Sequence, residues 1–208
     1  MKVVYNLLNE RNAKVAAQIM RVVCYIVIAF FVLCLILSLM GRQSFRLQTN
    51  TAFYAKAIYA EDNHNPPSRS FTVSTYDDIL VQTGVDDQIT FMTHIVLSVM
   101  YVIHIVPLII AFWFLSCVFS NVGKGQIFTE QNGRYLLYYG IIQLFVSLFV
   151  PLIKRFVCGL SNLISSNTIT ISTDSNWLNA LIPSIAFIVA AYVIHYGIHL
   201  QDEVDHTL

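Results

Sequence analysis

Histidines within long apolar segments are the residues of this sequence whose type and spacing most favour a chemical role. His195 and His199 stand four residues apart, about one helical turn, and His104 lies at a comparable depth in another apolar segment. Facing histidines on neighbouring helices can ligate a haem or a transition metal inside a bundle. A histidine bonded to a neighbouring helix is the commoner case, so ligation is a minor alternative. We predict no cofactor and no metal site.

The other reactive residue types form no recognisable site. The cysteines lie in or beside apolar runs without a CxxC spacing, and no GxSxG nucleophile motif occurs. The acidic pairs Asp77-Asp78 and Asp86-Asp87 lack the glycine and the spacing of an EF-hand loop, which favours a solvated face. Net charge is zero without runs of basic residues, so direct nucleic-acid binding is not expected. We predict that the chain is not an enzyme and has no catalytic residue.

Composition indicates a membrane protein, because 56% of the 208 residues are hydrophobic and only 12% are charged. About 20 apolar residues cross the hydrocarbon layer as a helix. The sequence predicts an all-α fold, a four-transmembrane-helix bundle in a single domain, 1–208. Its spans cover about 22–41, 89–120, 135–153 and 178–199.

Four spans place both termini on one side of the membrane, but Lys and Arg are divided equally between the two sides. The flank before the first span decides the orientation, because the first span usually dominates and long loops translocate with little regard to charge. Lys2, Arg11, Lys14 and Arg21 lie there. We therefore predict cytoplasmic termini. No Asp, Glu, Lys or Arg lies within the predicted spans, which argues against a proton-coupled transporter.

Two extracytoplasmic loops are predicted, 42–88 and 154–177. Residues 71–75 and 168–172 alternate apolar and polar types, as half-buried strands do. Because both loops lie on one side, these strands can pair into a small cap over the bundle. Two independent loops are the equally weighted alternative.

A cytoplasmic hairpin, 121–134, joins the second and third spans. Gly123 and Gly125 supply backbone angles that let the helix end, and Ile127-Phe128 can dip into the membrane interface. Thr129 is the predicted N-cap of the third helix, and Asn132 stands where a full capping box has Glu or Gln.

A polar stripe precedes the first span. Arg11, Lys14, Gln18 and Arg21 share one helical face and are expected to meet anionic lipid headgroups.

The chain ends in an acidic segment on the same side as the basic hairpin, and we predict contact between them. The candidate partner-binding residues are Lys124, Phe128, Thr129, Asn132, Arg134, Asp202, Glu203 and Asp205.

These two segments also carry a resemblance to a known family. The residues concerned are Gly125, Ile127, Phe128, Thr129 and Asn132, then Gly197, Leu200, Gln201, Asp202, Glu203, Asp205 and Thr207. In these residues and in its layout the chain resembles the bacterial membrane family called domain of unknown function 2975. Leu208 replaces the usual final Val, and the outer loop is longer than is typical.

The resemblance implies a small four-span protein of the bacterial inner membrane, often encoded beside a helix-turn-helix regulator. Our leading interpretation is a non-enzymatic regulatory or sensory protein that binds a cytoplasmic regulator through its hairpin and tails. The alternative is a homo-oligomeric channel, transporter or immunity protein against an envelope-acting agent.

Overall fold

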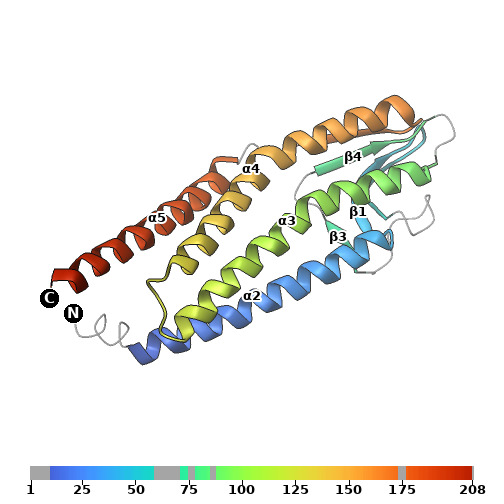
Figure 1. Ribbon diagram of the computed structural model, residues 1–208. Coiled ribbons are helices and arrows are strands. Elements are labelled where there is room, and N and C mark those ends of the chain that lie inside the picture. Colours follow the sequence, from blue (N-terminus) through green and yellow to red (C-terminus); the bar gives the residue numbers. More distant parts are fainter. Residues whose placement is uncertain (1–9, 59–70, 75–77, 85–87, 173–176, 208) are drawn as a thin grey trace. The chain divides into compact units, whose positions relative to one another are not determined.

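The computed structural model describes residues 10–58, 71–74, 78–84, 88–172 and 177–207. Four long helices account for most of them (Figure 1): α2 (Glu10–Leu39), α3 (Phe91–Gly123), α4 (Glu130–Ile164) and α5 (Trp177–Thr207). Each contains a stretch long and apolar enough to cross a bilayer. The predicted four-helix bundle is confirmed, and the chain is a multi-pass membrane protein with four candidate spans.

A five-stranded mixed sheet joins the two predicted outer loops. Its strands are β1 (Gln43–Gln48), β2 (Phe53–Ile58), β3 (Val73–Ser74), β4 (Asp78–Gln82) and β5 (Thr168–Ser172). The order is β2-β1-β4-β5, with β3 paired to β1. The β1–β2 and β4–β5 pairs are antiparallel, and β1 runs parallel to both β3 and β4.

Strands of the two predicted outer loops therefore pair with each other. Of the two predicted strands, only the one at residues 168–172 takes part in this pairing between the loops. Residues 168–172 form β5, which pairs with β4 in the register Asp78↔Ser172 to Gln82↔Thr168. Of residues 71–75, Val73 and Ser74 form β3, whose partner is β1. The strand of the first loop that meets β5 is β4, which the alternation of polar and apolar residues did not indicate.

The chain divides into two compact units. The sheet unit comprises Phe31–Val106 and Leu148–Trp177, and the hairpin unit comprises Met1–Phe30, Pro107–Ser147 and Leu178–Leu208. Because open sheet edges do not occur in the hydrocarbon layer, the strands of the sheet unit lie outside it.

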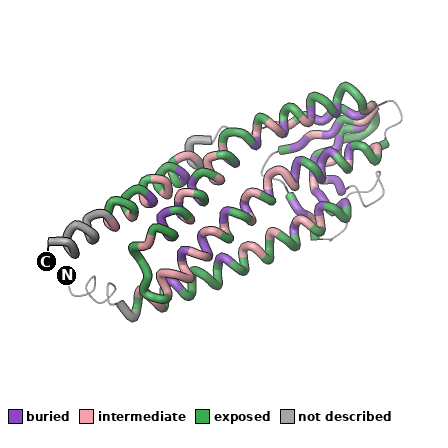
Figure 2. The backbone as a smooth tube through the Cα atoms, in the orientation of Figure 1, coloured by how far each residue is buried: buried purple, intermediate pink, exposed green. Residues whose placement is uncertain are grey.

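Alternate strand residues of the sheet unit point into one hydrophobic core, drawn as buried segments in Figure 2. Leu47 of β1, Val81 of β4 and Ile169 of β5 are each at most 1% exposed. Leu97 of α3 and Cys158 of α4 pack into the same core. Burying this apolar area holds the sheet against α3 and α4.

Polar side chains fix the ends of the strands to the helices. The Asn162 amide donates to the Ile169 carbonyl at 3.0 Å and accepts from the Ile169 N–H at 2.8 Å. Asn167 donates to Thr93 Oγ1 at 3.1 Å, and the buried Gln43 amide donates to Ser38 Oγ. These bonds satisfy polar groups that would otherwise be costly to bury.

Helix α4 ends at Ile164, so the first eleven residues of the predicted second outer loop, 154–164, are helical. The Lys154-Arg155 pair resembles a span boundary, but the helix continues because Cys158 packs into the sheet core. With 35 residues, α4 is roughly 52 Å long and exceeds the ~30 Å hydrocarbon layer.

In the hairpin unit, α4 and α5 approach each other closely at Gly140. A Cβ on Gly140 would lie 2.7 Å from Ile188 Cγ1 and 3.1 Å from both the Ile188 nitrogen and the Ser184 carbonyl oxygen. Beside this contact, the Tyr139 and Phe187 rings meet edge to face with centroids 4.6 Å apart. Small residues at such contacts are typical of helices that associate in lipid.

Candidate partner-binding face

The hairpin begins with a glycine C-cap on α3. Gly125 has φ +84°, its N–H donates to the Val122 carbonyl at 2.9 Å, and the Gln126 N–H donates to the Asn121 carbonyl at 3.0 Å. This pair of bonds is a Schellman motif, which needs a left-handed residue. Gly123 is the last residue of α3, so only Gly125 supplies the unusual backbone angle that was predicted for both glycines.

The hairpin ends at a side-chain cap on α4. Thr129 precedes the helix, and its Oγ1 accepts from the Asn132 N–H at 3.3 Å. Glu130 is the first helical residue, where a carboxylate is favoured by the helix dipole. The predicted N-cap is confirmed.

Asn132 holds the hairpin together from inside. It is 0% exposed, and its amide donates to the carbonyls of Gln126 at 2.7 Å and Ile127 at 3.0 Å. Its Oδ1 accepts from the Asn121 amide at 2.8 Å. Because its polar atoms bond within the hairpin, Asn132 positions the exposed residues rather than presenting a surface of its own.

Four of the exposed residues form what we call the hairpin face: Lys124, Ile127, Phe128 and Arg134. Ile127 is 43% exposed and Phe128 is 56% exposed. A Cβ on Gly197 of α5 would lie 3.2 Å from Phe128 Cδ1, so the phenyl ring packs on the glycine. The end of α5 is thereby brought beside the hairpin.

Helix α2 also contacts the hairpin. A Cβ on Gly125 would lie 3.3 Å from Lys14 Cε, and one on Gly123 would lie 3.6 Å from Gln18 Cγ. The two residues therefore pack at the C-terminal end of α3, where a cation is favoured by the dipole. Arg21 lies 5.6 Å from the centroid of the Tyr25 ring. The Arg11 side chain lies outside the described residues, and contact of the stripe with lipid headgroups stays a prediction.

The acidic residues of the candidate set lie on α5, whose backbone is helical to Thr207. The side chains of Asp202, Glu203 and Asp205 lie outside the described residues, as does that of His199. Arg134 pairs with Glu130 one turn earlier, and both side chains are more than 60% exposed. Contact between the acidic end and the basic hairpin stays a prediction.

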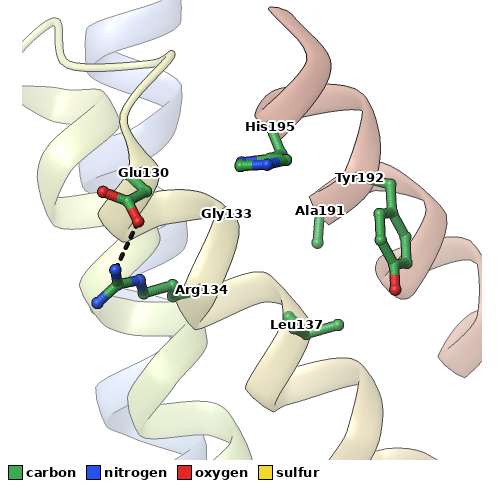
Figure 3. A pocket seen from close by; sticks show the side chains of 7 residues that line it. All are labelled: Glu130, Gly133, Arg134, Leu137, Ala191, Tyr192 and His195. Carbon is green, nitrogen blue, oxygen red and sulfur yellow. Dashed lines mark hydrogen bonds and ion pairs between the residues drawn. The ribbon is translucent and has the colours of Figure 1, made fainter. Parts of the chain in front are cut away.

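A pocket of about 220 Å³ lies beside the hairpin face, between α4 and α5 (Figure 3). Its lining is Glu130, Gly133, Arg134 and Leu137 from α4, with Ala191, Tyr192 and His195 from α5. Only Arg134 among these was in the set of candidate partner-binding residues predicted from the sequence.

Gly133 and Gly140 are seven residues apart on one face of α4. This spacing of small residues is a signal in the sequence that could have indicated the close contact between α4 and α5.

His104 and His195, two of the histidines singled out in the sequence, belong to different units. His104 belongs to the sheet unit, where its Nδ1 lies 3.3 Å from Lys154 Nζ, whereas His195 lines the pocket of the hairpin unit. Lys154 is 3% exposed and lies within α4, one residue beyond the predicted third span. Among the residues that the structure describes, no three His, Cys, Asp or Glu side chains gather as a metal site would require.

The fold and the hairpin face define a four-span membrane protein with a structured sheet outside the lipid. No family model, curated protein or solved structure matches the chain.

Proposed function

We propose that this protein is a non-enzymatic regulatory or sensory protein of the bacterial inner membrane, with both termini in the cytoplasm. It binds a soluble protein through the hairpin face and the end of α5. Two exposed apolar side chains on a rigid turn, Ile127 and Phe128, are the observation that carries this proposal.

Rigidity supports this role for the hairpin face. The Schellman motif at Gly125, the Thr129 cap and the three side-chain bonds of Asn132 fix the turn before any partner arrives. A preorganised loop loses less conformational entropy on binding, so more of the contact energy appears as affinity. Aromatic anchors are also the residues that most often dominate protein interfaces.

Charge supports a polar rim around the apolar centre. Lys124 and Arg134 are exposed on either side of Ile127 and Phe128 along the chain. An apolar centre with charged surroundings is the usual anatomy of a transient interface.

The test is photo-crosslinking in native membranes at Ile127, followed by co-purification with the full-length protein. Phe128→Ala should reduce the amount of the crosslinked partner at least tenfold, because a central aromatic anchor is typically worth 2 kcal/mol or more, roughly thirtyfold. Phe156→Ala is the matched control, since Phe156 is 67% exposed on α4 in the sheet unit. Equal loss in the two variants would refute the proposal.

Orientation is tested separately by cysteine labelling of Gln126→Cys and His206→Cys in intact cells. Both positions should be protected from an impermeant reagent. Accessibility of the two positions from opposite compartments would contradict the four-span topology on which the proposal depends.

A further inference from the structure

The C-terminal part of α4 extends beyond the hydrocarbon layer. Between Arg134 and Lys154 the helix has no charged residue, over a length of roughly 28 Å that matches the ~30 Å layer. Cys158 then packs into the core that it shares with the strands, which lie outside the layer. Residues 156–164 of α4 therefore stand beyond the hydrocarbon layer, at the level of the sheet.

One side of α4 is buried here, and the opposite side carries large apolar side chains. Lys154, Cys158 and Ser161 mark the buried side and are at most 6% exposed. Exposed segments recur as far as the C-terminal end of the helix (Figure 2). Residues three or four positions apart make up the opposite side, which we call the α4 stripe: Phe149, Leu152, Phe156, Leu160 and Leu163.

The far end of the α4 stripe faces water in a single copy. Leu163 and its neighbour Ile164 are 84% and 74% exposed in the last turn of α4, although this turn lies beyond the hydrocarbon layer. A continuous apolar surface that is exposed to water typically marks an interaction site.

We propose that the α4 stripe is the interface of a homodimer in which the α4 helices of two copies run parallel. Membrane insertion gives every copy the same orientation and height, so a twofold axis along the membrane normal brings each stripe against itself. Apolar residues spaced three and four positions apart are also typical of the seam between two parallel helices.

A second copy covers the whole stripe, which other occupants do not. Lipid chains reach Phe149 and Leu152 inside the hydrocarbon layer but not Leu163 beyond it. A soluble protein reaches Leu163 but not the residues inside the lipid. The continuity of the stripe across the two environments therefore favours another membrane-inserted helix of the same length.

Charge and area are also suited to self-association. The five residues of the stripe are uncharged, so a twofold contact brings no like charges together along it. With roughly 100 Å² exposed on each of these side chains, two copies would bury on the order of 1,000 Å², the size at which a specific interface is expected.

The first test is disulfide crosslinking of the full-length protein in native membranes. Phe156→Cys and Leu163→Cys should each give a disulfide-linked dimer on oxidation, because the twofold axis places each position beside its copy in the partner. Arg155→Cys is the matched control, since Arg155 is exposed at the same height but lies about 100° around the helix from Phe156. It should give no more dimer than the wild-type protein, whose four cysteines are buried or half-buried.

The strength of the dimer is measured by equilibrium sedimentation of the full-length protein in detergent. Leu163→Gln should raise the dissociation constant about tenfold or more, because the amide must be buried in an apolar seam. Leu39→Gln makes the same replacement at a leucine that is 55% exposed on α2, and it should leave the constant unchanged. Both leucines are exposed in the single copy, and a monodisperse profile verifies that each variant folds.

Three outcomes of the crosslinking would overturn the proposal. A crosslinked product of another size would mean that a different protein covers the stripe, and no product from either stripe position would leave lipid as its occupant. Equal crosslinking of Arg155→Cys and Phe156→Cys would indicate random collisions. Each copy keeps its own hairpin face, so weakening the dimer with Phe156→Ala leaves capture of a soluble partner unchanged, and the two proposals fail separately.

Discussion

In the sheet unit, helices α3 and α4 are held by a shared hydrophobic core and by side chains that hydrogen-bond strand backbones. In the hairpin unit, α4 and α5 meet through Gly140, with an aromatic edge contact beside it. The surroundings explain the difference. Strands outside the lipid gain stability by removing apolar area from water, whereas lipid-facing helices have no such gain and depend on close packing.

Truncating the sheet core should therefore affect one unit far more than the other. Leu47→Ala removes a side chain that is 1% exposed at the centre of this core, which typically costs about 2–5 kcal/mol. Amide hydrogen exchange in β1, β4 and β5 should rise at least about thirtyfold, with little change in α5.

Phe53→Ala is the control for Leu47→Ala. Phe53 pairs with Gln48 in the same sheet but is 59% exposed, so its removal should change stability by no more than about 0.5 kcal/mol. Equal acceleration of exchange in α5 and in the strands would show that the two units unfold together, and the contrast between them would fail.

The hairpin is a turn at the membrane surface in the hairpin unit. Like the strand ends of the sheet unit, it is fixed by hydrogen bonds from a buried polar side chain. Asn132→Ala leaves the Asn121 amide and two backbone carbonyls without their partner, at a cost of roughly 2–3 kcal/mol. Trypsin cleavage after the exposed Lys124 should become faster in the folded protein. Gln131→Ala, at the exposed neighbouring position, should leave the cleavage rate unchanged, and faster cleavage there would mean that the turn is not held by Asn132.

Features set by local physics were predictable from the sequence. Four apolar segments of sufficient length gave the four helices, the alternation in residues 168–172 gave β5, and Thr129 gave the cap of α4. In each case the deciding pattern lies within the element or a few residues from it, so the element can be predicted from that segment of the sequence alone.

Features set by tertiary contacts were not predictable in the same way. The continuation of α4 past Lys154 depends on Cys158 entering a core that includes residues far away in sequence, such as Leu47 of β1 and Val81 of β4. The pairing of β4 with β5 depends on the same assembly. In the candidate site, Asn132 resembled an exposed cap residue until its bonds to Asn121 and the hairpin carbonyls placed it inside.

The close approach of α4 and α5 can be tested with two glycines of the same helix. A Cβ on Gly140 would stand 2.7 Å from Ile188 Cγ1, whereas one on Gly159 would have nothing within 4 Å. Replacing a helical glycine by alanine gains up to about 1 kcal/mol, so Gly159→Ala should raise the thermal unfolding midpoint of the detergent-solubilised protein. Gly140→Ala has the same gain but must push α5 away, at a cost of about 1–3 kcal/mol, and should lower that midpoint. If both variants raise the midpoint alike, the helices of the hairpin unit do not depend on a close glycine contact, and the proposed contrast with the sheet unit fails.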